Sequence, residues 1–187
     1  MATDKPLTKN IEEGRAPFNF KKYTAAGGYE SVHKVIKMEP ADAVELVKNA
    51  GLGGRGGAGF NTGLKWSFVP PPDGGPRYLV INADEMEPGT FKDRLLIEND
   101  PHLLIEGMIT TCFALQSNCG YIFLRGEYTD CEERLLKAIK EAYDNGMLGK
   151  NVAGKKGFDL DIYLHTSAGR YICGEETALL NALEGKR

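Results

Sequence analysis

The sequence predicts an α/β layer fold with a mostly parallel sheet. Short apolar runs that suit buried strands alternate with longer segments whose apolar residues fall on one helical face. The chain has 187 residues, of which 42% are hydrophobic and 26% charged, the composition of a soluble globular protein with a single core. No internal repeat is visible.

The first fifty residues predict little regular structure. Residues 1–26 are polar, with scattered lysines, and predict an extended, poorly ordered lead-in. Residues 41–50 predict a short helix, because Pro40 precedes a stripe of apolar residues and Gly51 can cap the C-terminal end.

The rest of the chain alternates between strand and helix signals. Pro101 follows Asp100, a candidate cap, and residues 129–132 have the Thr-x-x-Glu capping-box pattern at the start of a helix. The predicted elements are, in order, strand 78–81, helix 101–115, strand 121–124, a helix from Thr129 through Ala142, a glycine-bearing linker 145–157, strand 158–164, a turn 167–174 and helix 175–183.

Charge and cysteine usage exclude several classes of function. A formal net charge of −3 gives no reason to expect a nucleic acid or an anionic membrane as partner. No apolar run reaches the about 18 residues of a membrane span, and residues 1–22 lack an export signal. The cysteines form no C-x-x-C pair, so we expect free thiols in a reducing cytoplasm and no metal site; they are Cys112, Cys119, Cys131 and Cys173.

The three histidines also give no catalytic signal. His33, His102 and His165 lie far apart in sequence, and none belongs to a Ser/His/Asp or Cys/His pattern. We expect ordinary core or surface histidines.

The most unusual segment is 51–63, in which seven of the thirteen residues are glycine. Glycine at this density indicates a backbone that approaches a ligand closely, with N–H groups turned toward phosphate oxygens. Arg55 and Lys65 add positive charge, and Phe60, Trp66 and Phe68 offer flat faces for an aromatic ring. A flexible linker is the alternative, although such linkers are usually serine-rich.

Two familiar phosphate loops do not account for this segment. Residues 54–59 spell G-x-G-x-x-G, but the dinucleotide fingerprint requires a preceding strand, and here a helix is predicted. No Gly-Lys-Ser/Thr follows, so a Walker A loop is excluded. The segment therefore predicts a nucleotide or flavin cradle of another kind.

Acidic residues follow the first predicted strand. Asp84, Glu85 and Glu87 come just after its carboxyl end, the place where open α/β sheets bind ligands, and Asn82 can both donate and accept hydrogen bonds. This pattern suits a polyol or a ribose; a solvated acidic turn is the alternative. Farther on, Glu175 and Glu176 open the last helix, where negative charge is favourable with or without a ligand.

Three motifs together resemble one family. Gly-Arg-Gly-Gly-Ala-Gly-Phe (54–60) with Thr-Gly-Leu-Lys-Trp-Ser (62–67), Asn-Ala-Asp-Glu-Met-Glu-Pro-Gly-Thr-Phe-Lys-Asp-Arg (82–94), and Gly-Arg-Tyr-Ile-Cys-Gly-Glu-Glu-Thr-Ala-Leu (169–179) are similar to those of the NADH-binding flavoprotein subunit of respiratory complex I. The likeness runs from about Leu7 to the last residue. Related subunits of NAD-linked hydrogenases and formate dehydrogenases share the motifs, and a nucleotide-binding module without redox activity remains an alternative.

The resemblance implies a Rossmann-like domain in which NADH passes a hydride to FMN and electrons leave through iron–sulphur clusters toward quinone. No side chain needs to act as acid or base. The resemblance also implies two parts of the chain: an N-terminal extension and helix over 1–50, and an FMN- and NADH-binding domain over 51–187. Partners would be other subunits of a hydrophilic arm, including a thioredoxin-like 2Fe–2S subunit, on the cytoplasmic side of the inner membrane and without direct membrane contact.

The resemblance also implies that the chain is a fragment. The family continues beyond Arg187 into further FMN phosphate contacts, a ubiquitin-like domain and a 4Fe–4S domain, so we expect weak FMN binding. Gly53 and Asn61 depart from the family pattern, in which arginine and proline are usual.

Site residues transfer position by position. The loop 54–63 would hold NADH and FMN through its backbone, with Lys65 nearby. Asn82, Asp84 and Glu85 would bind the ribityl chain and the dinucleotide, and Glu87 would contact NADH. Phe60 and Phe68 would stack near the adenine, and residues 174–176 would flank the flavin ring and the nicotinamide. The predicted cofactor-binding residues are Gly54, Arg55, Gly56, Gly57, Ala58, Gly59, Phe60, Gly63, Lys65, Phe68, Asn82, Asp84, Glu85, Glu87, Tyr171, Gly174, Glu175 and Glu176.

Overall fold

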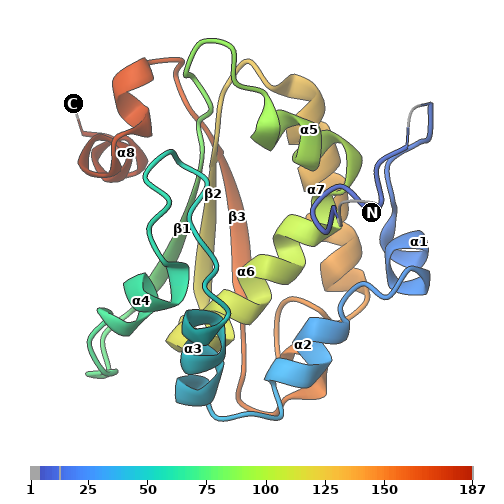
Figure 1. Ribbon diagram of the computed structural model, residues 1–187, viewed down its shortest axis with the longest axis vertical. Helices are drawn as coiled ribbons and strands as arrows, with labels where there is room; N and C mark the ends of the chain where they lie inside the picture. The colour runs from blue at the N-terminus through green and yellow to red at the C-terminus, as the bar shows by residue number, and fades with distance from the viewer. Residues whose placement is uncertain (1–4, 13, 187) are drawn as a thin grey trace.

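A three-stranded parallel sheet in the order β1-β2-β3 forms the centre of the computed structural model, which describes residues 5–12 and 14–186 (Figure 1). Tyr78 pairs with Cys119, which pairs with Asp161, so the three strands start level and end level. Their carboxyl ends therefore lie at one edge of the sheet, which confirms the predicted α/β fold. The strands are β1 (Tyr78–Ala83), β2 (Cys119–Leu124) and β3 (Asp161–Thr166).

Helices cover one face of the sheet. α6 packs on β1 and β2, α7 packs on β3, and α1 and α2 lie outside this pair (Figure 1). None of the helices in the described residues is long and apolar enough to cross a membrane. The helices are α1 (Phe20–Ala25), α2 (Glu30–Val35), α3 (Pro40–Asn49), α4 (Thr62–Ser67), α5 (Lys92–Asn99), α6 (Pro101–Leu115), α7 (Thr129–Asp144), the 3-10 turns η1 (Val152–Gly154) and η2 (Tyr171–Gly174), and α8 (Glu176–Leu183).

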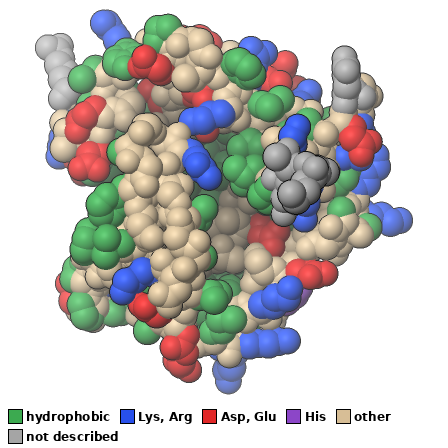
Figure 2. All heavy atoms as spheres, in the orientation of Figure 1, with side chains coloured by type: hydrophobic (Ala, Val, Ile, Leu, Met, Phe, Trp, Pro, Cys, Tyr) green, Lys and Arg blue, Asp and Glu red, His purple; other side chains and the backbone are tan. Residues whose placement is uncertain are grey.

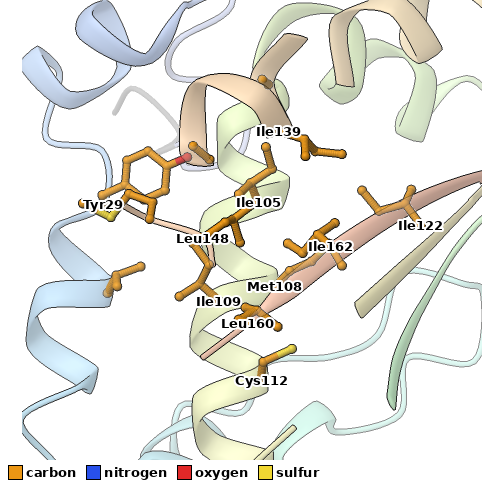
Figure 3. Close-up of a cluster of buried hydrophobic side chains, with 14 of the residues drawn as sticks. Tyr29, Ile105, Met108, Ile109, Cys112, Ile122, Ile139, Leu148, Leu160 and Ile162 are labelled. Atoms are coloured by element: carbon orange, nitrogen blue, oxygen red, sulfur yellow. The ribbon is translucent and has the colours of Figure 1, made fainter. Parts of the chain in front are cut away.

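The core lies between α6 and the sheet. Ile105, Met108 and Ile109 of α6 point toward Ile122 of β2 and Ile162 of β3, and all five are buried (Figure 3). The packing is tight at one point of this contact, since a Cβ at Gly120 would lie 2.8 Å from the terminal methyl of Met108, which would have to move. Burial of this apolar surface fixes α6 on the sheet.

The N-terminal helices are held by a buried carboxylate of α6. Glu106 Oε2 accepts hydrogen bonds from the hydroxyl of Tyr23 and, at 2.9 Å, from the backbone N–H of Tyr29. Its other oxygen accepts from the N–H and the hydroxyl of Ser31. The expectation of a poorly ordered lead-in is therefore wrong for α1, whose Tyr23 is 2% exposed.

His102 is a structural histidine in the same region. It is fully buried, and burial lowers its pKa despite the neighbouring Glu141 carboxylate. A neutral ring has one donor and one acceptor, so Nε2–H donates to Glu141 at 3.0 Å and Nδ1 accepts from the Tyr29 hydroxyl at 2.8 Å. Glu141 also accepts from the N–H of Phe20 at 2.7 Å, which ties the start of α1 to α7.

Several local predictions differ from the structure. The capping box at Thr129 does not form, because the N-cap of α7 is Tyr128 and the helix has no side-chain cap. β3 starts at Asp161 rather than at residue 158. The predicted linker over 145–157 is packed, with Leu148 and Val152 buried, because its glycines adopt the positive φ values that let a tight loop fold back on the core.

We predict that Glu106→Gln lowers the free energy of unfolding by about 2 kcal/mol, because a buried acceptor of four hydrogen bonds loses its charge and one acceptor oxygen. Urea unfolding measures the effect. Glu133→Gln, at an exposed position of the neighbouring helix α7, is the matched control and should change stability little. Equal stability of the two variants would contradict this role of Glu106.

A second prediction concerns two helical glycines. A Cβ at Gly63 would lie 2.1 Å from the backbone nitrogen of Lys48, so Gly63→Ala must push α4 away from α3 and should destabilise by about 2 kcal/mol. Gly107 of α6 faces open space, so Gly107→Ala should stabilise by about 0.5–1 kcal/mol. Thermal unfolding should therefore shift in opposite directions, and a shift of the same sign would refute the packing argument.

Candidate functional site

The glycine-rich segment is a closed loop rather than a flexible linker. Its ends pair like a hairpin, since Gly54 N donates to Phe60 O at 2.8 Å and Thr62 N donates to Leu52 O at 2.8 Å. Gly57 and Gly59 adopt φ values of 108° and 64°, which residues with a side chain rarely adopt. The two ends of the loop are therefore fixed relative to each other, and the glycines let the backbone turn between them.

The tip of this loop presents unused hydrogen-bond donors. The backbone N–H groups of residues 55–60 donate to none of the residues that the structure describes, and these residues are exposed. In Figure 2 the loop forms a ridge of backbone, and Lys, Arg, Asp and Glu side chains gather beyond its upper end. A row of unpaired N–H groups beside Arg55 is a site at which phosphate oxygens can be bound.

The segment that carries Asp84, Glu85 and Glu87, called the carboxylate loop below, begins where β1 ends. Asn82 orients it, because its side-chain oxygen accepts from the N–H of Asp84 at 3.1 Å and its amide donates to Gly174 O at 2.7 Å. Asp84 is 5% exposed, and its Oδ2 has no hydrogen-bond partner among the described residues. Burial raises the pKa of Asp84, and the hydrogen bond from Ser167 opposes this shift only in part.

The carboxylate of Glu85 forms hydrogen bonds within the protein. It accepts from the N–H of Asp93 at 3.1 Å and of Arg94 at 3.3 Å, at the start of α5, and from the Tyr128 hydroxyl at 3.2 Å. Burial opposes ionisation, but these hydrogen bonds and the ammonium of Lys92 outweigh it and lower the pKa of Glu85. The side chain predicted to bind ligand thus anchors the loop.

The third motif faces the carboxylate loop. The Tyr171 hydroxyl donates to Glu87 Oε2 at 2.6 Å, which joins η2 to the loop after β1. Glu175 is the N-cap of α8, with its carboxylate accepting from the N–H groups of Thr177 at 3.1 Å and Ala178 at 3.0 Å. The negative charge of Glu175 is thus explained by the helix that it starts.

A cleft of about 950 Å³ lies where the three motifs meet. It is large enough for a nucleotide-sized ligand. Of the predicted residues, those that line it are Arg55, Gly56, Gly57, Asn82, Asp84, Glu85, Glu87, Tyr171, Gly174 and Glu175.

The other predicted residues lie outside the lining of this cleft. Gly63 is packed inside the α3–α4 contact, and Phe60 and Phe68 are exposed with ring centroids 6.2 Å apart. The remaining ones are Gly54, Ala58, Gly59, Lys65 and Glu176. Sequence reasoning missed five lining residues, of which Lys92 and Asp93 begin a helix that had not been predicted; the others are Met86, Thr90 and Ile172.

A parallel sheet, a loop of unpaired N–H groups and a cleft at the carboxyl ends of the strands define an α/β domain of the nucleotide-binding kind. The chain belongs to the Nuo51 FMN-binding domain family, which matches residues 47–187. This match confirms the flavoprotein family that the three motifs predicted.

Relatives include the subunit designated F in the NADH-quinone oxidoreductase of Escherichia coli (strain K12), 54% identical over 184 residues. That match covers 97% of this chain and 41% of the relative. The corresponding subunit of Aquifex aeolicus (strain VF5) is 51% identical over 183 residues, which cover 98% of this chain and 40% of the relative. The chain therefore spans less than half the length of these proteins.

Solved structures agree with the fold. A crystal structure of the NAD⁺-reducing [NiFe]-hydrogenase in the H₂-reduced state matches with a TM-score of 0.71 and 36% identity, over 81% of this chain and 26% of that chain. The air-oxidised state gives a TM-score of 0.71 and 35% identity, over 88% of this chain and 27% of that chain. The Rossmann-like α/β architecture is thus shared with an NAD-linked enzyme.

We predict that Glu85→Gln destabilises the chain by about 2 kcal/mol at pH 7, because the amide cannot accept all the hydrogen bonds that the carboxylate accepts. The native pKa of Glu85 is lowered, so its stabilisation is complete above the unfolded value of about 4.3 and is lost as pH falls through the native value. The stability gap between wild type and variant should therefore shrink at acid pH.

Urea unfolding at pH 7 and below pH 4 measures this gap, with Glu133→Gln as the control whose gap stays near zero. A gap of the same size at both pH values would show that the charge of Glu85 does not stabilise the fold.

Proposed function

We propose that the cleft binds FMN and NADH and that the chain is the NADH-oxidising flavoprotein part of an NADH-quinone oxidoreductase. One observation supports this most directly: the unpaired N–H groups of residues 55–57 and the carboxyl group of Asp84, one oxygen of which has no partner among the described residues, line the same cleft. Phosphate needs donors, and a ribityl chain offers hydroxyl groups that need acceptors. The residues present therefore fit both halves of FMN.

Each motif would hold a different part of the ligands. The loop 54–60 with Arg55 would bind phosphate, Asp84 would accept from hydroxyl groups, and Glu87 with Tyr171 would border the space for the dinucleotide. Phe60 and Phe68, exposed and near each other, would offer faces for the adenine. Gly174 would let a flat ring approach the backbone, and Glu85 would act indirectly by fixing the loop.

When bound, FMN supplies the two-electron acceptor that takes hydride from NADH and the one-electron chemistry that follows. The chain would contribute binding, orientation and electrostatics. We expect no side chain to act as an acid or base, and three carboxylates at the cleft already have partners in the fold: Glu85 accepts from the first turn of α5, Glu175 caps α8, and Glu87 accepts from Tyr171.

Sequence and structure relatives support membership of a multisubunit redox complex. We infer that the chain works with other subunits of a hydrophilic arm, including a thioredoxin-like 2Fe–2S subunit, on the cytoplasmic side of the inner membrane. The 4Fe–4S cluster of the family would lie outside these 187 residues.

A second candidate function is the equivalent subunit of an NAD-linked hydrogenase, which the structural match at 36% identity favours. Identity to the oxidoreductase subunits is higher, at 54%, so the first function is preferred. The two differ in the electron acceptor, and a gene neighbourhood that encodes membrane subunits would support the oxidoreductase.

The proposed function is tested by incubating the purified chain with FMN, recording its visible absorbance and then adding NADH without oxygen. Protein-bound flavin bands that bleach with NADH are expected. Asp84→Asn should weaken FMN binding about tenfold or more, because a hydrogen bond to a charged group is lost, whereas Asp144→Asn on the exposed face of α7 should not.

Absence of bound flavin at millimolar FMN would contradict the proposal. Tight binding of an adenine nucleotide under the same conditions, without flavin, would instead identify a nucleotide-binding module without redox activity.

A further inference from the structure

Ser167 lies at the cleft edge of the sheet, although neither the motifs nor the family resemblance pointed to it. It follows β3 directly, and its N–H continues the sheet by donating to Leu124 O at 2.7 Å. Its hydroxyl donates to Asp84 Oδ1 at 2.8 Å, and both residues are buried, at 8% and 5% exposure. This hydrogen bond spans 83 residues of sequence and crosses the end of β2.

A glycine makes this hydrogen bond possible. A Cβ at Gly126, just beyond β2, would lie 2.3 Å from the carbonyl oxygen of Ser167, so any side chain there would push the end of β3 away. The N–H groups of Gly126 and Gly169 each approach the Ser167 hydroxyl oxygen at 3.4 Å. Because these groups can only donate, the hydroxyl hydrogen is free to point at the acceptor with which the structure pairs it, the carboxylate of Asp84.

Only one oxygen of Asp84 is satisfied in this way. Oδ2 is buried and has no hydrogen-bond partner in the described part of the chain, although Asp84 lines the cleft. A buried carboxylate oxygen without a donor is costly, so a ligand that brings a hydroxyl group to this position gains more than it would from an exposed acceptor.

We propose that Ser167 is a positioning residue, which fixes one oxygen of Asp84 so that the other is presented to a hydroxyl group of a polyol ligand. The inference rests on the proposed function, in which the ribityl chain of FMN is the polyol. Ser167 itself does not line the cleft, so its effect on binding acts through Asp84.

The first test needs no ligand. Carbon-13 NMR of the side-chain carboxyl groups, with the Asp84 signal assigned by its loss in Asp84→Asn, follows the titration of Asp84 in wild type and in Ser167→Ala. The Ser167 hydrogen bond and Arg125 lower the pKa of Asp84, whereas burial and the nearby Glu127 raise it. Ser167→Ala should therefore raise this pKa, and an unchanged pKa would overturn the positioning role.

The second test measures FMN affinity by flavin fluorescence in four variants. Ser167→Ala should weaken binding roughly three- to tenfold, less than Asp84→Asn, because the effect reaches the ligand only through the orientation of Asp84. Ser117→Ala is the matched control, because Ser117 is also buried and its hydroxyl donates to Arg77 O, at the amino end of the strands. In an Asp84→Asn background, Ser167→Ala should cause no further loss.

The outcomes separate this inference from the proposed function. Equal affinity of wild type and Ser167→Ala, or an additive loss in the double variant, would overturn the inference while FMN binding stands. If wild type binds no flavin, the proposed function and the ligand part of the inference both fail, and the NMR titration alone decides whether Ser167 orients Asp84.

Discussion

The level register of three parallel strands is the constraint on which the rest of the structure depends. Because β1, β2 and β3 end at the same height, residues 82–87, 125–127 and 167–175 meet at one edge although they are far apart in sequence. The packing of α6 on β1 and β2 keeps this register fixed. The hydrogen bond between Ser167 and Asp84 exists only because the strand ends cannot shift relative to one another.

Carboxylates in this chain stabilise helix starts from a distance. Glu106 accepts from the first N–H groups of α2, Glu141 from that of α1, and Glu85 from those of α5, whereas α8 is capped by its own Glu175. Charged acceptors at the positive end of a helix satisfy donors that have no partner within the helix. An acidic residue near a binding motif can therefore belong to the scaffold, as Glu85 does.

The sequence could predict those elements whose signals are local, and it could not predict those that depend on contacts between distant residues. Apolar runs identify β1 and β2, and the amphipathic spacing of α7 and the long apolar α6 identify both helices, because those signals are local. The short helices α1, α2, α4 and α5 were missed. Helices α1 and α2 depend on distant partners such as Glu106, which lies 77 residues from Tyr29, whereas α4 is capped by its own Asn61. The motifs located most of the cleft, whereas no motif includes Ser167 and only the fold brings it into contact with Asp84.

The hydrogen-bond donors of the glycine-rich loop do not respond to a change of pH. Its donors are peptide N–H groups, which neither gain nor lose a proton over the range in which proteins stay folded, whereas side chains such as His or Asp do. The strength with which these N–H groups attract an anion therefore changes with pH only when the anion itself gains or loses a proton. Asp84, which lines the same cleft, carries a carboxyl group whose pKa is raised by burial. Two groups that line one cleft thus respond differently to acid: the loop keeps its hydrogen-bonding character unchanged, and Asp84 does not.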